Sequence, residues 1–468
     1  MHATQHLVDD ICIMPPSPKL RRRLDRQFRA LKREAAGLLA PRLTLREQDR
    51  IGFNDGLVRP GTTFPAGTPA LVARRAALER APLRGTVRVL VVVVDFADRA
   101  LKSSSLNRLK DLFFSEGVLP HGSVREYYND VTRHAIRIDG EVVGPFRMPR
   151  PISDYAGSQN GTQSAQPNAR TLAEDAFQAA KDSTDFGPYD NDGNGYVDAF
   201  IVVHAGHGAE ETGAPGDIWS HKWVLPSAEL ANGVSTYGYL TIPEDAKLGV
   251  CAHELGHLLF GWPDLYDTDY TSSGIGGYCL MASGSWGLGG NRPTHPSAWC
   301  KANQGWAQVV SRKRNGTSTL RDVKDGGRVY RLWQNGTTAT EYFLLENRQR
   351  TGYDESLPAG GLFIWHVDDS LQGNTNEAHY RVALVQADGK QDLEGNRNEG
   401  DPGDTWPGAT KAVTFDDSST PNSRSYAGNH TCVTVDEIQD EGPAMKVRMR
   451  VNCADAGTHA TVPPPPGA

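Results

Sequence analysis

The chain has 468 residues, which is too many for one compact core and predicts two or three domains. Hydrophobic residues make up 38% and charged residues 22%, values typical of a soluble globular protein rather than a disordered or membrane-embedded one. The formal charge of −7 argues against nucleic acid as a partner. No apolar run approaches the roughly 20 residues that a membrane span requires, so we expect none.

Residues 1–84 are expected to form an N-terminal helical segment and a linker, and this region is a candidate propeptide. Ser17 followed by Pro18 is typical of a helix start, because serine caps the first turn and proline suits the first helical position. Residues 51–83 are rich in glycine and proline, which predicts a linker. Cys12 stands alone just before the predicted helix.

A mixed α/β domain is predicted for residues 85–308. The runs VRVLVVVVDF and AFIVVHAG are continuously apolar, which is typical of strands buried on both faces. The segments SVREYYNDVT and RTLAEDAFQAAKD are expected to be helices, and strands alternating with helices favour an α/β layer. We expect AIRIDGEVVG to form a pair of strands and the alternating VSTYGYLTI to form an edge strand.

Residues 309–453 are predicted to form an antiparallel β-sandwich, because short strands there are separated by turn signals. A proline-rich tail follows over residues 454–468. Cys432 and Cys453 bracket a predicted hairpin, which suggests a disulfide and an oxidising compartment. The sequence does not begin with a basic segment followed by an apolar one, so no secretory signal is visible. The lack of a visible signal conflicts with the oxidising compartment that the disulfide suggests.

The pattern His253-Glu254-x-x-His257 is the strongest indication of function. On a helix over Ala246–Phe260 the two histidines lie on one face about 6 Å apart, which suits two imidazole nitrogens binding one tetrahedral zinc ion. Glu254 is then placed to hold a zinc-activated water and take its proton. The alternative is an amphipathic helix whose leucines fill the core and whose histidines pair elsewhere.

Longer strings around this motif resemble the M6 peptidases, the immune inhibitor A family of metzincin-type enzymes. The similarity rests on CAHELGHLLFGWPDLYDTDY, GIGGYCLMASGSWG and HPSAWCKANQGW, and further strings extend it over residues 85–410. It implies a secreted zinc-dependent endopeptidase with Glu254 as general base and proteins or peptides as substrates, and a monomer is the expected state. It also implies that Met281 is the Met-turn residue beneath the metal, with an ordinary core methionine as the alternative.

The third zinc ligand in that resemblance is an aspartate six residues beyond the second histidine. In this chain Gly261 stands four residues beyond His257 and Asp264 stands seven beyond, which amounts to one inserted residue before the glycine. If the turn shifts with the helix end, Asp264 keeps its place, so Asp264 is the predicted ligand and Asp267 the alternative. A site with two histidines and water alone is the remaining alternative.

A calcium loop is predicted between Asp190 and Asp198. It resembles the first part of an EF-hand loop, with oxygen ligands at positions one, three, five and nine and glycine at six. Position twelve is Ile201 instead of glutamate and a strand follows, so we expect a structural calcium site outside the EF-hand fold. The candidate ligands are Asp190, Asp192, Asn194, Tyr196 and Asp198. A simple polar turn is the alternative.

Two further hypotheses concern inactive forms of the protein. A thiolate is a good zinc ligand, so one hypothesis is that Cys12 occupies the open coordination position and holds the enzyme latent. Its alternatives are a disulfide to Cys300 and a buried free thiol. The other hypothesis is a catalytically inactive extracellular binding protein that uses the β-sandwich. The intact Glu254 argues against it, because an inactive site needs no general base.

Overall fold

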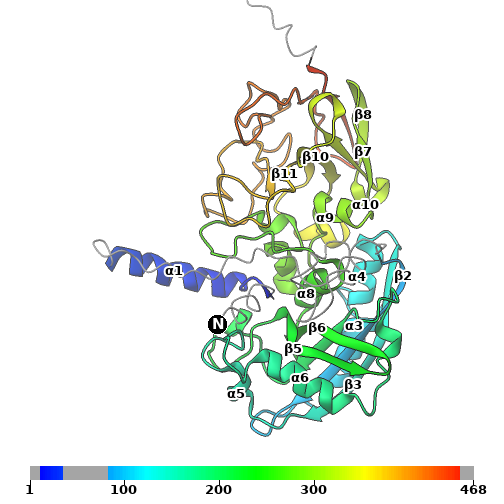
Figure 1. Cartoon of the computed structure of the whole chain (residues 1–468). Helices are drawn as coiled ribbons and strands as arrows, with labels where there is room; N and C mark the ends of the chain where they lie inside the picture. The colour runs from blue at the N-terminus through cyan, green and yellow to red at the C-terminus, as the bar shows by residue number, and fades with distance from the viewer. Residues whose placement is uncertain (1–10, 35–82, 454–468) are drawn as a thin grey trace, which may run out of the picture.

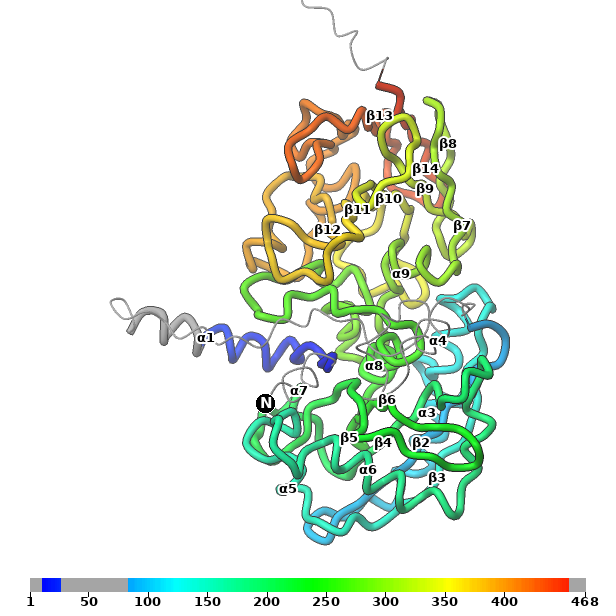
Figure 2. Tube along the Cα trace, viewed as in Figure 1, coloured from blue at the N-terminus to red at the C-terminus, as the bar shows by residue number. Residues whose placement is uncertain are grey.

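The structure, a computed structural model, describes residues 11–34 and 83–453, without the side chains of residues 27–34. Most of the predicted linker and the whole C-terminal tail lie outside these residues. An α/β half and a C-terminal half are stacked one on the other (Figures 1 and 2). Helix α8 (Leu248–Phe260) lies near the middle of the molecule, and α1 (Pro18–Glu34) runs outward from there.

A six-stranded sheet is the framework of the α/β half, in the strand order β1-β5-β6-β4-β2-β3. Strands β3, β2, β4 and β6 are parallel, whereas β5 and β1 are antiparallel to their neighbours. Parallel neighbours need crossover connections, which the helices between these strands provide. The strands are β1 (Cys12–Ile13), β2 (Gly85–Asp95), β3 (Ile136–Arg147), β4 (Phe200–His204), β5 (His221–Ala231) and β6 (Val234–Pro243).

Two expectations for this sheet are wrong. AIRIDGEVVG does not form two strands but belongs to one long strand, β3. Gly140 is inside this strand and not in a turn, and it is paired with Val89 of β2. A Cβ atom at Gly140 would sit 2.0 Å from the Val89 carbonyl oxygen, so the strand can continue here because the residue is glycine. VSTYGYLTI forms β6, which lies between β4 and β5 rather than at an edge. A polar side chain inside the sheet can still find a partner there, as when the Thr241 hydroxyl donates to the Val202 carbonyl at 3.0 Å.

The side chains of β2 alternate between two apolar layers, which explains the continuous apolar run over residues 89–94. Val89 and Val91 belong to the layer built with α3, α4 and α8, whereas Leu90 and Val92 belong to the layer built with α6. Both faces of the sheet are therefore covered, as parallel sheets require. The helices of this half are α3 (Ser105–Phe114), α4 (Val124–Val131), α5 (Ile152–Ala156), α6 (Ala169–Ala180), α7 (Ala209–Thr212) and α8, with 3-10 turns η1 (Gly187–Tyr189), η2 (Gly276–Tyr278) and η3 (Ser283–Gly290).

Two sheets build the C-terminal half, in the strand orders β12-β11-β10-β9-β7 and β13-β14-β8. They share one apolar cluster, to which Phe343 on β10 and Val447 on β14 both belong. The pairings are antiparallel except between β7 and β9, which are parallel, so the prediction of a purely antiparallel domain is wrong at this edge. The reason is that β8, which follows β7, joins the other sheet before the chain returns as β9.

The elements of this half are short. They are α9 (Ala298–Asn303), β7 (Gln308–Ser311), β8 (Gly316–Arg321), α10 (Val323–Gly326), β9 (Arg328–Leu332), η4 (Gln334–Gly336), β10 (Glu341–Arg348), η5 (Gly352–Ser356), β11 (Gly361–Asp368), β12 (Val382–Leu384), β13 (Thr434–Asp436) and β14 (Ala444–Arg450). Long connections without regular structure separate β12 from β13.

The two halves do not have separate cores. Leu344, on the second face of the five-stranded sheet, belongs to the same apolar cluster as Leu255 of α8 and Met281. Arg348 on β10 is fully buried and forms an ion pair with the buried Asp354 at 2.5 Å, and its guanidinium also donates to the Tyr278 carbonyl of the α/β half at 2.5 Å. The predicted boundary after residue 308 therefore divides the chain in sequence, but helix α8 is packed from both sides.

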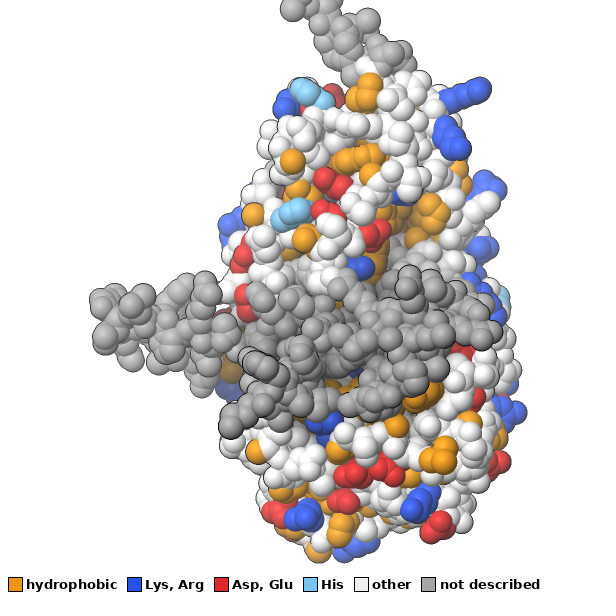
Figure 3. Space-filling view, viewed as in Figure 1, with side chains coloured by type: hydrophobic (Ala, Val, Ile, Leu, Met, Phe, Trp, Pro, Cys, Tyr) orange, Lys and Arg blue, Asp and Glu red, His pale blue; other side chains and the backbone are white. Residues whose placement is uncertain are grey.

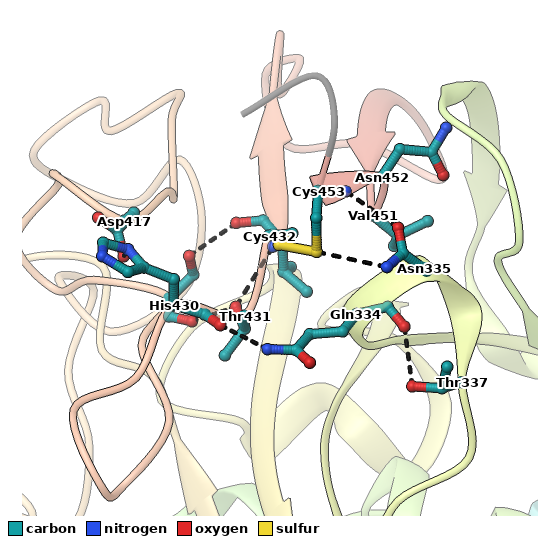
Figure 4. Close-up of a disulfide and its surroundings, with 12 residues drawn as sticks. Gln334, Asn335, Thr337, Asp417, His430, Thr431, Cys432, Val451, Asn452 and Cys453 are labelled. Carbon is teal, nitrogen blue, oxygen red and sulfur yellow. Dashed lines mark hydrogen bonds and ion pairs between the residues drawn. A yellow bond between two sulfur atoms is a disulfide. The ribbon is translucent and has the colours of Figure 1, made fainter. Parts of the chain in front are cut away.

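A disulfide joins Cys432 and Cys453 (Figure 4). Cys432 precedes β13 and Cys453 follows β14, and these two strands pair antiparallel. The Asn335 side chain accepts a hydrogen bond from the Cys453 backbone N–H at 3.0 Å, so the loop after β9 is held against the bridge. The disulfide thus closes one end of the three-stranded sheet.

The surface carries a mixture of charges. On the face drawn in Figure 3, acidic and basic side chains are interspersed over both halves. Within residues 11–34 and 83–453, no helix is both long and apolar enough to cross a lipid bilayer.

Candidate metal centre

Helix α8 carries both histidines of the HExxH motif and is buried along its full length. It ends at Gly261, which has a φ of 62° and whose N–H bonds the carbonyls of Gly256 and His257. This left-handed conformation is open to glycine without steric cost. The predicted helix over Ala246–Phe260 therefore has the right end, and it begins two residues later than expected, at Leu248.

Three donor atoms converge beside this helix, namely Nε2 of His253, Nε2 of His257 and Oδ1 of Asp264. Each histidine nitrogen lies 3.1 Å from the aspartate oxygen, and the two nitrogens lie 2.9 Å apart. The three side chains are at most 3% exposed. The structure thus brings both histidines of the motif together with the aspartate of the turn that follows.

Backbone carbonyls hold both imidazole rings. Nδ1 of His253 lies 2.9 Å from the Leu280 carbonyl oxygen, and Nδ1 of His257 lies 2.6 Å from the Trp262 carbonyl oxygen. A carbonyl only accepts, so each Nδ1 carries the proton and each Nε2 keeps a lone pair for the cluster. Partners of this kind orient histidine ligands in metal sites.

Asp264 and Asp267 lie in different surroundings. Only Asp264 joins the two histidines. The Asp267 carboxylate accepts hydrogen bonds from the backbone N–H and the hydroxyl of Ser272, both at 2.8 Å. It forms a separate group with Asp269 and Glu377. The inserted residue is therefore accommodated by the turn at the helix end, and Asp267 is not among the converging donors.

Met281 lies against the turn of α8 that separates the two histidines. A Cβ atom at Gly256 would sit 2.6 Å from the Met281 sulfur, so only glycine permits this close approach. Met281 is fully buried, and the preceding residue, Leu280, supplies the carbonyl that holds His253. Met281 is thus a buried neighbour of α8, and its role as the Met-turn residue beneath a metal stays a prediction.

Burial and neighbouring charges set the protonation of the cluster. Burial raises the pKa of Glu254 well above its ordinary value. For Asp264 burial acts in the same direction, but the electrostatic attraction of His257, and of His253 beside it, outweighs burial and lowers the pKa. Burial lowers the pKa of His253. Burial would also lower that of His257, but the neighbouring Cys12 and Asp264 raise its pKa instead.

This donor set fits a zinc ion. Two imidazole nitrogens and a carboxylate oxygen are usual zinc ligands with bonds of about 2.0–2.2 Å. Donor atoms that lie 2.9 to 3.1 Å apart are close enough to share one such ion. Both Glu254 oxygens and Asp264 Oδ2 are buried and have no hydrogen-bond partner in the described part of the chain. Such unpaired oxygens are costly, and a nearby cation offsets that cost.

The predicted calcium loop brings three carboxylates together. Oxygen atoms of Asp190, Asp192 and Asp198 lie within 4.8 Å of one another. The Asn194 backbone N–H donates to Asp190 Oδ1 at 3.0 Å, and the Asn194 side-chain oxygen accepts from the Tyr196 N–H at 2.8 Å. All five predicted residues thus belong to one tightly folded loop, with the three aspartates at its centre.

Two other residues lie beside the cluster of His253, His257 and Asp264. The Cys12 sulfur is within 4.8 Å of the donor atoms of His257 and Asp264. Tyr266, which sequence reasoning missed, is 3% exposed and donates from its hydroxyl to the Ile13 carbonyl at 2.7 Å. The only signal for Tyr266 in the sequence was its position two residues after the predicted ligand.

Comparison with known proteins indicates a metallopeptidase, a class of enzyme to which the donor set described above is suited. Residues 83–314 match the family model described as immune inhibitor A peptidase M6, catalytic domain. Residues 83–314 therefore form a domain of the M6 metallopeptidase family, which confirms the resemblance seen in the sequence.

Two known proteins are similar in sequence to part of this chain. Pre-pro-metalloprotease PrtV of Vibrio cholerae serotype O1 is 31% identical over 270 residues, which are 46% of this chain and 29% of PrtV. Immune inhibitor A of Bacillus thuringiensis subsp. alesti is 31% identical over 324 residues, which are 54% of this chain and 47% of that protein. The chain therefore spans less than half the length of either relative in these matches.

Proposed function

We propose that this chain is a zinc-dependent endopeptidase of the metzincin type that hydrolyses peptide bonds in proteins. The observation that carries the proposal is the convergence of His253, His257 and Asp264 beside the buried Glu254. Catalytic zinc sites hold the ion with three protein ligands and keep a further position for water or substrate. Membership of the M6 family supports the same activity.

The roles of the residues follow from their chemistry. Bound zinc supplies Lewis acidity, which polarises the scissile carbonyl and lets water lose a proton near neutral pH. Glu254 is the general base that takes this proton and passes it to the leaving amine. Its two oxygens are available for this task because neither has a partner among the described residues. Met281 and the Leu280 carbonyl keep the helix and His253 in position.

We also infer a structural calcium ion in the loop from Asp190 to Asp198. Three carboxylates within 4.8 Å of one another repel unless a hard cation neutralises them. The side-chain oxygen of Asn194 and the carbonyl of Tyr196 are the further ligands of the proposed site. Its position just before β4 supports a structural role, because that strand lies inside the catalytic sheet.

The proposal also covers the fold of the C-terminal half and the compartment in which the protein works. Two sheets around one apolar cluster support a β-sandwich that packs on the catalytic half. The Cys432–Cys453 disulfide supports a secreted protein, because disulfides persist mainly in oxidising compartments. The inactive binding protein is the weaker prediction, since a buried Glu254 without a partner in the described residues costs stability and serves no binding role.

Zinc content and peptide hydrolysis together test this function. We expect one zinc per chain by mass spectrometry and casein hydrolysis that a chelator abolishes and added zinc restores. Hydrolysis is measured in the wild type and in Cys12→Ser, because Cys12 lies beside the donor atoms. One bound zinc without hydrolysis in either protein would favour the binding protein. A chain that binds no zinc would overturn the proposed metal centre.

A further inference from the structure

The segment Ile11–Ser17 lies along the metal centre as an extended peptide. Its strand β1 (Cys12–Ile13) extends the edge of the catalytic sheet, antiparallel to β5. The Met14 N–H continues the pairing by donating to the Ser220 carbonyl at 3.0 Å. Addition of an extended chain to a sheet edge is a recurrent mode of peptide binding, in which main-chain hydrogen bonds supply affinity.

Side chains of the catalytic half bind successive carbonyls of this segment. The Tyr266 hydroxyl donates to Ile13 at 2.7 Å, the Trp219 indole to Met14 at 2.7 Å, and the Trp286 indole to Pro15 at 2.9 Å. Each contact recognises the backbone and not a side chain of the segment. The segment therefore occupies a surface suited to extended peptides of varied sequence.

This arrangement places the Cys12 sulfur at the donor cluster. Cys12 is 2% exposed, and its sulfur lies within 4.8 Å of the donor atoms of His257 and Asp264. Thiolate sulfur is a usual zinc ligand, and a zinc ion in a closed site takes four ligands. Independently, Asp264 Oδ2 is buried without a partner in the described regions, which indicates a cation at this place.

Helix α1 anchors the segment to both halves of the molecule. The Arg21 guanidinium donates to the Ser272 carbonyl and to the Asn396 side-chain oxygen, both at 3.0 Å. It also lies over the Tyr270 ring, 4.9 Å from the centroid. Leu20 beside it is 2% exposed. The chain after Cys12 is therefore held by contacts that do not depend on a metal.

We propose that Cys12 is the fourth ligand of the metal and that the segment Ile11–Arg26 is a built-in inhibitor of the active site. This inference rests on the proposed zinc centre. On ligation the Cys12 thiol releases its proton to solvent and a sulfur–metal bond forms. Activation breaks that bond, water takes the ligand position, and the sheet edge beside β5 becomes free for substrate.

Cobalt(II) in place of zinc tests the sulfur ligand by its absorption spectrum. The full chain is compared with Cys12→Ser and with Cys251→Ala, a control that removes another buried free cysteine. Wild type and Cys251→Ala should show an intense sulfur-to-cobalt charge-transfer band. Cys12→Ser should bind one cobalt per chain and lack that band. A cobalt-loaded wild type without the band would overturn Cys12 as a ligand.

Peptidase activity of the zinc-loaded proteins tests the inhibition. We expect Cys12→Ser to hydrolyse casein at least about tenfold faster than the wild type, because a larger fraction of molecules is open to substrate. Arg21→Ala, which loosens the anchor, should also raise the rate, while Cys251→Ala should match the wild type. Equal activity of wild type and Cys12→Ser would overturn the inhibitor and leave the peptidase standing. Absence of bound cobalt in wild type and Cys251→Ala would overturn the metal centre and the inhibitor together.

Discussion

The Tyr266 hydroxyl donates a 2.7 Å hydrogen bond to the carbonyl oxygen of Ile13. Tyr266 follows Asp264 by two residues, so a phenol hydroxyl beside the metal donors binds the backbone of a chain at the sheet edge. A substrate that replaces this chain would present its own carbonyl at the same place. Tyr266 is therefore expected to position substrate.

Tyr266→Phe, made in the Cys12→Ser background, should lower kcat/KM about fivefold, because one hydrogen bond to a carbonyl contributes about 1 kcal/mol. Zinc content should not change. Tyr155→Phe is the matched control, since it removes another phenol hydroxyl, one that bonds Asp175 within the α5–α6 region. Equal kcat/KM for Tyr266→Phe and Tyr155→Phe would contradict the positioning role.

Glu254→Gln should reduce hydrolysis by at least about a hundredfold in the Cys12→Ser background, because proton transfer by a positioned base contributes roughly 10²–10⁴. The three donor residues are unchanged, so zinc stoichiometry should stay at one per chain. Steady-state rates and metal analysis of the same samples check both statements. A variant that keeps a tenth of the reference rate would rule out Glu254 as the base.

Asp264→Ala should weaken zinc binding at least about a hundredfold, since even outer partners of ligands contribute tenfold to a hundredfold. Asp267→Ala should leave the zinc affinity nearly unchanged, because its carboxylate bonds Ser272 instead of joining the histidines. Competition with a fluorescent zinc chelator measures both constants. The reverse order would move the third ligand to Asp267.

Calcium should stabilise the wild type and not a variant with Asp190→Asn and Asp192→Asn combined. A ligand at a hundredfold excess over its dissociation constant adds about 2.7 kcal/mol to the free energy of unfolding. Thermal melts at fixed zinc, with and without millimolar calcium, measure the effect. A wild-type melting temperature that does not change when calcium is added would show that the loop is only a polar turn.

Acid should weaken the contact between the two halves through Asp354. Burial alone would raise the pKa of Asp354, but the charges of Arg348 and His295 outweigh it and hold the pKa well below its ordinary value of 3.8. An acid with a lower pKa in the folded chain stabilises it above the unfolded pKa, and this stabilisation is lost as the pH falls. The contribution is therefore complete at neutral pH and declines below about pH 4.

Asp354→Asn should lower the free energy of unfolding at pH 7 by about 3 kcal/mol, because a buried arginine loses its partner. Its stability should also fall less steeply than that of the wild type below about pH 4. Asp325→Asn, at an exposed position, is the control. Urea unfolding of the metal-free proteins separates this effect from loss of bound ions, and parallel pH curves for all three proteins would contradict the assignment.

Local patterns in the sequence determined most elements of the fold. The Ser17-Pro18 start of α1 appears as predicted, with the Leu20 N–H donating to the Ser17 hydroxyl at 3.2 Å. The apolar run of β2 and the spacing of His253 and His257 on α8 depend on one strand and one helix, so their periodicity is readable without knowing the neighbours.

Tertiary structure decided the remaining features, because the residue pattern of each segment by itself does not encode them. Asp264 and Asp267 both follow α8 in the sequence, and only the left-handed turn at Gly261 selects which of them reaches the histidines. Strand β6 alternates like an edge strand, yet β5 covers its outer side. Cys12 meets His257 because β1 pairs with β5, and no local periodicity in either segment encodes that pairing.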